Sequence, residues 1–137
     1  ITINNFYRNK LKRKPKIAVL GLNPHNDEFR PRSEEKKIII PVIKKLKKKR
    51  FDVIGPFSAD TIFFNKKKYI YDIIVGMYHD QVLPPYKTLY GFDAINVTLG
   101  LKYIRISPDH GIAKDMVGLN KANPLSLIKA IEFIFKI

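Results

Sequence analysis

Short apolar runs that stop abruptly at glycine-containing or polar stretches constrain the fold of this chain more than any other feature. The first run, residues 16–20, is apolar after its lysine and ends at Gly21, which is typical of a buried parallel strand. Similar runs predict strands at residues 52–54, 71–75, 94–97 and 103–106. Because helical segments alternate with these strands, the sequence predicts an α/β fold with a layered sheet.

Two segments have the pattern of helices. Ser33 is the predicted N-cap of the first, with acidic residues 34–35 in its positive first turn. Pro41 should kink or split this helix. A closing helix is expected over residues 125–135, directly after a proline. The apolar face of the first helix is predicted to carry Ile39, Ile43 and Leu46.

The composition indicates one ordinary domain. Residues 1–15 are polar and basic and are expected to form an irregular lead-in, followed by a single α/β domain over residues 16–137. The absence of cysteine excludes disulfides and thiolate metal sites. No apolar run has the length of a membrane span, and residues 1–16 lack the apolar core of a signal peptide. We therefore expect a soluble, cytoplasmic protein, and one that is a piece of a longer chain because it does not begin with Met.

The formal net charge of +14 makes a nucleic-acid-binding module one interpretation. The 26 basic residues are 20 Lys and 6 Arg, however, and base and phosphate recognition favours arginine. The lysines lie in tracts at residues 10–16, 44–50 and 66–68, which is typical of solvated faces. Nucleic acid is therefore an unlikely partner, and a basic binding module is kept as the alternative from another functional class.

Polar clusters follow the predicted strands, at residues 21–25, 55–61, 77–81 and 107–111. In open α/β sheets, ligands bind beyond the carboxyl ends of the strands. All three histidines of the chain lie in these clusters, which favours a ligand site, although spacing alone identifies no metal. The chain has no HExxH, P-loop or GxGxxG motif.

Five ordered blocks of sequence resemble the 4-hydroxythreonine-4-phosphate dehydrogenase (PdxA) family of vitamin B6 biosynthesis: GLNPH, GPFSADTIF, MYHDQVLPPYK, INVTLGLKYIR and SPDHGIAKDMVGLNKANP. The match runs from about Lys16 to the C-terminus and covers the C-terminal part of that family's chain. The resemblance implies a three-layer α/β/α sandwich of the isocitrate/isopropylmalate dehydrogenase-like type, incomplete because the N-terminal part is missing.

The resemblance also implies a divalent-metal site that is shared across a homodimer interface. His25 and His79 match two of the family's three metal-ligand histidines, and the third belongs to the missing part. Neutral imidazole suits Zn and, less ideally, Mg or Co, so the metal stays open. Asp60 and Asp80 are the carboxylates within the motifs near these histidines. We interpret them as catalytic residues that orient the histidines or carry protons, with turn or cap roles as the alternative.

Substrate contacts are implied for Lys87, Asn96 and Arg105, which match substrate-binding residues of the family. An ammonium and a guanidinium suit a phosphate or carboxylate, and an amide can hold a hydroxyl group. Without the motif, Lys87 would be interpreted as a solvated surface lysine. Arg105 lies within the apolar run 103–106, and an inward-facing arginine there would need an anionic partner.

The last motif resembles the NAD-binding loop of isocitrate and isopropylmalate dehydrogenases. His110 and Gly111 fit a tight loop against the cofactor, and Asp115 could accept hydrogen bonds from the adenosine ribose. Asn123 is expected near the adenine. Helix-capping roles are the alternatives for Asp115 and Asn123.

The implied reaction is the oxidation of a secondary alcohol, with hydride transfer to NAD, followed by decarboxylation. For this family, the substrate is 4-phosphohydroxy-L-threonine and the product is 3-amino-2-oxopropyl phosphate. The chain departs from the family at residues 26–32, where a glycine-rich acidic stretch is usual. A related dehydrogenase of another phosphorylated hydroxy acid or of a cyclic diol is therefore the alternative. We expect the 137-residue chain alone to be inactive.

Overall fold

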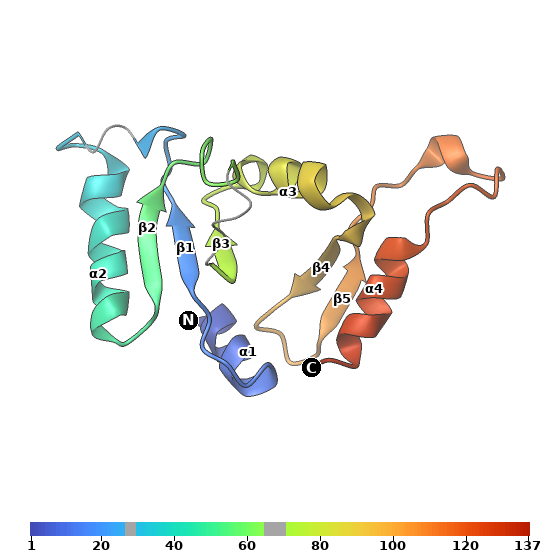
Figure 1. Cartoon of the computed structure of the whole chain (residues 1–137), viewed down its shortest axis with the longest axis horizontal. Coiled ribbons are helices and arrows are strands. Elements are labelled where there is room, and N and C mark those ends of the chain that lie inside the picture. The colour runs from blue at the N-terminus through green and yellow to red at the C-terminus, as the bar shows by residue number, and fades with distance from the viewer. Residues whose placement is uncertain (27–29, 65–70) are drawn as a thin grey trace. The chain divides into compact units, whose positions relative to one another are not determined.

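The computed structural model describes residues 1–26, 30–64 and 71–137 (Figure 1). The lysine tract at residues 66–68 lies outside the described residues. So do residues 27–29, which belong to the stretch that departs from the family pattern.

The chain forms two compact units. The sheet unit comprises residues 13–85, and the hairpin unit joins residues 1–12 to residues 86–137. The boundary falls within helix α3 (Leu83–Tyr90), whose two prolines lie in its first turn, where a missing N–H costs nothing. The sequence did not predict α3, and the single domain expected for residues 16–137 stays a prediction.

A parallel three-stranded sheet forms the centre of the sheet unit. Its strands are β1 (Ile17–Leu20), β2 (Val53–Phe57) and β3 (Ile73–Val75), in the order β2–β1–β3. Ala18 and Leu20 of the central strand are fully buried. The three strands expected in this part of the chain are therefore confirmed, as is the mixed α/β class.

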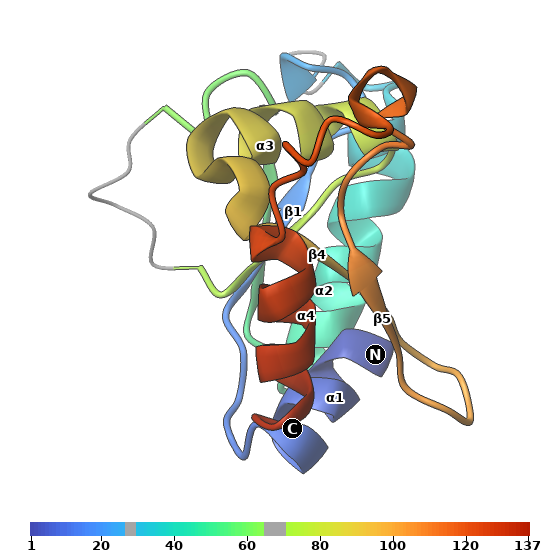
Figure 2. The same cartoon turned by 90° about the vertical axis from the view of Figure 1, so that its right-hand side faces the viewer.

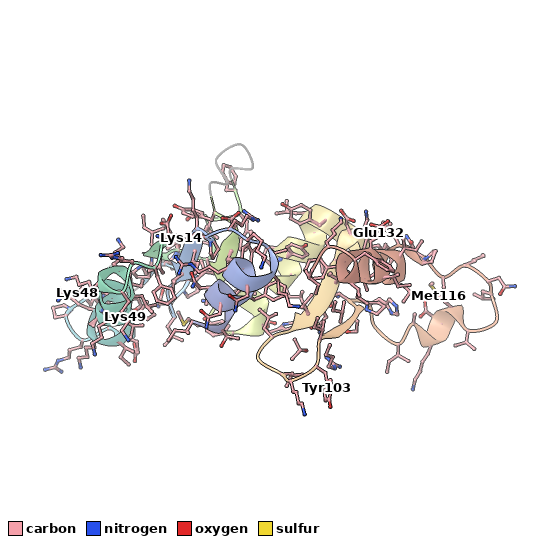
Figure 3. The ribbon with its side chains drawn as sticks, turned by 90° about the horizontal axis from the view of Figure 1, so that it is seen from below. Lys14, Lys48, Lys49, Tyr103, Met116 and Glu132 are labelled. Carbon is pink, nitrogen blue, oxygen red and sulfur yellow. The ribbon has the colours of Figure 1, made fainter. Side chains whose placement is uncertain are left out.

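The helix expected after residue 33 is split at its proline. A π-helical turn, η2 (Glu35–Ile39), leads into α2 (Ile40–Lys48), and Pro41 lies in the first turn of α2. Ile39 and Ile43 are buried, as their spacing predicted, and α2 packs against β2. The lysines at the end of α2 point away from the ribbon (Figure 3).

A carboxylate fixes the start of the sheet. Asp72 accepts a hydrogen bond from Lys16 N at 2.8 Å and pairs with the guanidinium of Arg13. The Lys16 hydrogen bond outweighs the effect of partial burial and, together with the charges of Arg13 and Lys16, holds the pKa of Asp72 below its ordinary value. The chain segments that enter β1 and β3 are thereby joined.

The hairpin unit is built on an antiparallel pair, β4 (Ile95–Thr98) and β5 (Arg105–Pro108). Helix α4 (Leu125–Ile134) packs along both strands (Figure 2). Ser126, in the first turn of α4, is fully buried. Its hydroxyl donates to Ala94 O and accepts from the backbone N–H of Asp109. The two strands and the closing helix expected here are confirmed.

Residues 1–15 are not an irregular lead-in, because Thr2–Lys10 form helix α1. The ring of Phe6 stacks on that of Phe133 from α4 with centroids 6.4 Å apart, and Asn4 is buried. A nine-residue helix is marginal on its own, so the contact with α4 contributes to the order of α1. The expectation of an irregular segment is wrong for this reason.

Candidate functional site

Three polar loops leave the same edge of the parallel sheet. Residues 21–26 follow β1, residues 58–60 follow β2, and residues 77–81 follow β3. Because the strands are parallel, their carboxyl ends and these loops lie at one edge. The position of the polar clusters directly after the strands is as the sequence predicted.

His25 and Asp60 come together from two of these loops. His25 Nδ1 lies 3.1 Å from Asp60 Oδ2, and the His25 imidazole is 75% exposed. The Ser58 hydroxyl contacts both Pro24 O and Asp60 Oδ1, which fixes the carboxylate against the first loop. Because a carboxylate only accepts, Asp60 favours a proton on Nδ1 and leaves the His25 Nε2 lone pair available.

His79 and Asp80 form a second pair of the same kind. His79 Nδ1 lies 2.6 Å from Asp80 Oδ1, in the short helix η4 (His79–Gln81). The preceding residue, Tyr78, donates its hydroxyl proton to Leu22 O at 2.7 Å and so ties this loop to the loop of His25. Both aspartates therefore lie where an orienting carboxylate is expected, on the Nδ1 side of an exposed imidazole.

A pocket of about 400 Å³ opens beside these pairs within the sheet unit. Both aspartates line it, so the structure brings the two carboxylates to one cavity although they lie 20 positions apart in the sequence. Much of the remaining wall is apolar. The lining residues are Pro24, Ala59, Asp60, Phe63, Tyr78, Asp80, Gln81 and Pro85.

The donor chemistry of these pairs fits a divalent metal ion. Metal-bound histidine commonly gives its other ring N–H to a carboxylate, which fixes the ring and raises its basicity. His25 and His79 both have that arrangement here. Within residues 1–26, 30–64 and 71–137, no three His, Asp or Glu side chains gather as a metal-binding set. The ligand roles of His25 and His79 therefore stay a prediction.

Buried polar side chains cross-link the three loops. Gln81 donates to Gly21 O at 2.8 Å and accepts from Met77 N at 2.7 Å, so it joins the loop after β3 to the end of β1. Asn26 joins the first loop to β2: its amide donates to Phe57 O and accepts from Ser58 N at 2.9 Å. These two residues are 6% and 7% exposed.

Glu35 is the third cross-link and differs from its expected role. The sequence places it in the exposed first turn of a helix, yet it is fully buried, and its Oε1 accepts from both Leu22 N and Asn23 N at 2.8 Å. Burial by itself raises the pKa of Glu35, but the hydrogen bonds from Asn23, Leu22, its own N–H and Ser33 lower it further than burial raises it. Sequence reasoning missed this role, because Glu35 is flanked by Glu34 and Lys36 and has the local pattern of an ordinary helix-start acid.

The predicted substrate-binding residues lie in the hairpin unit. Lys87 Nζ lies 3.6 Å from Asp109 Oδ2, an acid that sequence reasoning did not single out. Arg105 is not inward-facing: it is exposed, and its guanidinium donates to Thr98 Oγ1 at 3.1 Å across the hairpin. Asn96 is exposed on β4. These side chains are therefore accessible to a ligand, and Lys87 already faces an anionic group.

A tyrosine adjoins Lys87 in the same unit. Burial raises the pKa of Tyr86, and Tyr90, Asp93 and Asp109 raise it further. The Tyr86 and Tyr90 rings lie 4.7 Å apart. The surroundings of Tyr86 therefore combine two acids with a second aromatic ring, and one of these acids, Asp109, also pairs with Lys87.

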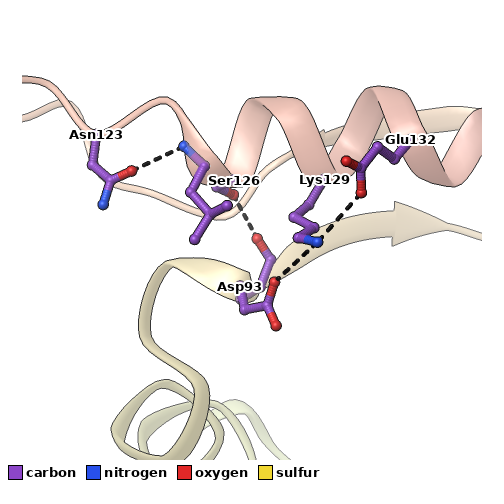
Figure 4. A network of polar contacts seen from close by, with 7 residues as sticks. Asp93, Asn123, Ser126, Lys129 and Glu132 are labelled. Carbon is purple, nitrogen blue, oxygen red and sulfur yellow. Dashed lines mark hydrogen bonds and ion pairs between the residues drawn. The ribbon is translucent and has the colours of Figure 1, made fainter.

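The predicted NAD-binding residues lie on an exposed stretch between β5 and α4. His110 Nδ1 lies 3.0 Å from Gly111 O, and a side chain at Gly111 would meet no atom within 4 Å. Asp115 lies in the short helix η6 (Lys114–Met116), with no side-chain cap hydrogen bond there. Asn123 is a cap: its Oδ1 accepts from Leu125 N at 2.9 Å (Figure 4). The capping role left open for Asn123 is thus present.

Comparison with known proteins identifies the family. The family model of the pyridoxal phosphate biosynthetic protein PdxA matches residues 1–134. A 4-hydroxythreonine-4-phosphate dehydrogenase from Bradyrhizobium diazoefficiens is 52% identical over 120 residues, which are 87% of this chain and 35% of that protein. The chain therefore spans about a third of the length of this curated relative.

Solved structures agree with that match. The structure of a 4-hydroxythreonine-4-phosphate dehydrogenase from Klebsiella pneumoniae superposes with a TM-score of 0.77 at 38% identity, over 96% of this chain and 40% of that one. A terephthalate 1,2-cis-dihydrodiol dehydrogenase from Burkholderia xenovorans gives 0.71 at 29% identity, over 98% and 43%. None of the helices in the described part of the chain has the length and apolarity to cross a membrane. With its family match over residues 1–134 and its fold shared with these enzymes, the chain belongs to the PdxA family.

Proposed function

We propose that this chain supplies the metal-binding and NAD-binding part of a dehydrogenase in pyridoxal phosphate biosynthesis. The reaction is the oxidation of 4-phosphohydroxy-L-threonine, with decarboxylation, to 3-amino-2-oxopropyl phosphate. The observation that carries the proposal is the pair of His–Asp contacts at the carboxyl edge of the parallel sheet, within a chain of the PdxA family.

The histidines are the proposed metal ligands. Asp60 and Asp80 hold the Nδ1 side of His25 and His79, so that each ring presents Nε2 to a divalent ion. Such an ion, when bound, supplies positive charge that favours the deprotonated form of a substrate hydroxyl group. Both carboxylates also line the pocket, where they are placed to hold a proton released from that hydroxyl.

The hairpin unit is proposed to hold the ends of the two substrates. Lys87 and Arg105 are exposed cations for the phosphate or carboxylate of the hydroxy acid, and Asn96 offers an amide. Asp109 keeps Lys87 in one orientation until an anionic ligand competes for it. His110, Gly111, Asp115 and Asn123 are proposed to contact NAD. We further propose that the active enzyme is a homodimer.

A cyclic-diol dehydrogenase is the second candidate. The similarity to the terephthalate dihydrodiol dehydrogenase favours it, as does the apolar lining of the pocket, since a ring would pack against Phe63, Tyr78 and the two prolines. The phosphorylated substrate is preferred because a relative of 52% identity has the name of the phosphate enzyme, whereas the diol enzyme is 29% identical.

A chimeric enzyme tests the proposal. The corresponding 120-residue segment of the Bradyrhizobium diazoefficiens relative is replaced by that of this chain, and NADH formation is followed with each candidate substrate. We expect metal-dependent NADH formation with 4-phosphohydroxy-L-threonine and a loss of about 100-fold or more for His79→Ala. Lys48→Ala, on the far end of α2, serves as the matched control with unchanged rate.

Two results would contradict the proposal. Unchanged turnover after His79→Ala would remove its role as a ligand, and turnover of a dihydrodiol alone would favour the second candidate. The 137-residue chain by itself should form no NADH. Tight, salt-resistant and sequence-selective binding of DNA would instead support the basic binding module.

A further inference from the structure

The buried carboxylate of Glu35 reaches beyond its own helix. Glu35 begins η2, but its Oε1 reaches back to two consecutive amides of the loop after β1, Leu22 N and Asn23 N, at 2.8 Å each. Its neighbour Glu34, in the same turn, is exposed. The contrast between the two acids indicates that Glu35 serves the loop rather than the charge of the helix end.

Gly21 makes this approach possible. A Cβ at position 21 would lie 3.2 Å from Glu35 Oε1 and 2.0 Å from the side-chain amide of Asn26. Both buried side chains therefore pack directly on the backbone where β1 ends. Gly21 N still donates to Phe57 O at 2.9 Å, so the loop is held by the sheet on one side and by Glu35 on the other.

The hydrogen bonds continue from Glu35 to His25. Asn23, whose N–H is held by Glu35, uses its own Oδ1 to accept from His25 N at 2.9 Å. The His25 imidazole then meets Asp60 at 3.1 Å. Leu22, the other residue held by Glu35, accepts from Tyr78 next to His79. Each step is a direct contact, and together the steps lead from a fully buried acid to an exposed imidazole.

Burial of this acid has a cost that its contacts offset. Glu35 Oε2 is buried and makes no hydrogen bond to any part of the chain that the structure describes. A buried ionised carboxylate is expensive unless it is hydrogen-bonded, and bonds to a charged acceptor are about twice as strong as neutral ones. Here two such bonds go to adjacent amides of one loop.

We propose that Glu35 is the positioning residue for His25, acting as a clamp on the backbone of Leu22 and Asn23. The inference rests on the proposed function for what His25 binds, but the clamp is measurable without any metal. Glu35 holds the loop in the one conformation in which the His25 ring reaches Asp60. It touches neither the substrate nor the proposed metal and acts through Asn23.

NMR spectroscopy of the ¹⁵N-labelled 137-residue chain tests the clamp with three variants. Glu35→Gln keeps the shape and an acceptor oxygen but removes the charge, Glu35→Leu removes the acceptor, and Glu34→Gln is the matched control. We expect the Leu22 and Asn23 amides to exchange with solvent about tenfold faster in Glu35→Gln and faster again in Glu35→Leu. The His25 ring nitrogen shifts should move in the same order and by more than those of His79, which is linked to the clamp through Tyr78 and Leu22. Glu34→Gln should leave all of these signals as in wild type.

Two outcomes would overturn the proposal. Unchanged Leu22, Asn23 and His25 signals in a folded Glu35→Gln variant would show that the carboxylate does not hold the loop. Equal changes at His25 and His79 would show general support of the unit rather than positioning of one histidine. If both Glu35 variants fail to fold, the wild-type chain decides: slow exchange at Leu22 and Asn23 supports the clamp, and exchange at the rate of an open loop overturns it. Absence of metal binding would contradict the proposed function while leaving these readouts intact.

Discussion

The sheet unit and the hairpin unit bury their side chains in different ways. Among the residues of the sheet unit that the structure describes, seven hydrophobic ones are less than about a tenth exposed: Ile17, Ala18, Leu20, Ile39, Ile43, Val53 and Ile73. In the fully described hairpin unit, the hydrophobic residues buried to that degree are two alanines, Ala94 and Ala130. Five large apolar side chains of α4 are between 36% and 51% exposed: Leu125, Leu127, Ile128, Ile131 and Ile134. Phe135, directly after the helix, is 86% exposed.

Their polar contacts differ in the same direction. Glu35, Asn26 and Gln81 are buried in the sheet unit, and each joins two chain segments at the proposed site. In the hairpin unit, the polar contact that plays this part is that of Ser126, while the proposed ligand-binding side chains are exposed. The comparison indicates that the loops carrying His25 and His79, at the carboxyl edge of the sheet, are fixed by contacts within the sheet unit itself. The hairpin unit carries its proposed ligand-binding groups on a lightly packed frame.

The largest expected effect is on the core of the sheet unit. Leu20→Ala removes a fully buried side chain from β1 and should lower the free energy of unfolding by about 2–5 kcal/mol. The same substitution at Leu127 of α4, which is 49% exposed, should cost about 1 kcal/mol or less. Urea unfolding of the two variants measures both values. Equal losses would break the comparison between the units.

The second effect concerns the glycine beneath the clamp. Gly21→Ala should destabilise the sheet unit by about 1–3 kcal/mol because its methyl group displaces the Asn26 amide and crowds Glu35. Gly111→Ala is the matched control in the hairpin unit, where a Cβ meets nothing within 4 Å. Thermal unfolding of both variants measures the difference. An unchanged unfolding temperature for Gly21→Ala would show that the loop accommodates the methyl group without strain.

The third effect is a loss of stability in acid that belongs to the sheet unit. The pKa values of Asp72 and Glu35 are lowered in the folded chain, so the unfolded chain binds their protons more tightly. Their contribution is complete above the ordinary values, 3.8 for Asp72 and 4.5 for Glu35, and is lost as the pH falls through the lower folded values. Asp72→Asn should cost about 1 kcal/mol at neutral pH and less in acid. A cost that does not depend on pH would contradict this assignment.

The hairpin unit should respond at the opposite end of the pH scale. The pKa of Tyr86 is raised, so its contribution is complete below the ordinary value of 10.0 and is lost as the pH rises through the folded value. Unfolding of Tyr86→Phe should therefore depend less on pH above 10 than that of the wild-type chain.

The smallest effect is expected for a surface ion pair. Lys129 pairs with Asp93 at 3.9 Å and with Glu132 at 3.3 Å, and all three side chains are well exposed (Figure 4). Lys129→Ala should change the unfolding free energy by about 0.5 kcal/mol or less, and less still in high salt. A larger loss would mean that charge holds α4 to the hairpin more than the comparison allows.

The sequence predicted what local pattern determines. All five strands lie within a few residues of their apolar runs, and Pro41 splits the helix as its chemistry requires. The position of the histidines after strand ends follows from the same runs, since each run ends where its loop begins.

What the sequence could not predict depends on distant contacts. Glu35 has the pattern of a helix-start acid, and only the turn that brings it back to Gly21 makes it a buried acceptor. Helix α1 is ordered on α4, far away in the sequence. The sequence predicted that α4 is an apolar helix, but the spacing of apolar residues does not indicate whether another element covers them, and in the structure many of them are exposed.

The three histidines allow the most direct test of the central claim that the carboxyl edge of the sheet binds a divalent metal. In a cobalt(II) titration of the ¹⁵N-labelled chain, the ring signals of His25 and His79 should shift together and saturably, while His110 stays unaffected as the internal control. Asp60→Asn and Asp80→Asn should each weaken that response by about 10- to 100-fold. Equal shifts at all three histidines, or no saturable shift at His25 and His79, would contradict the account.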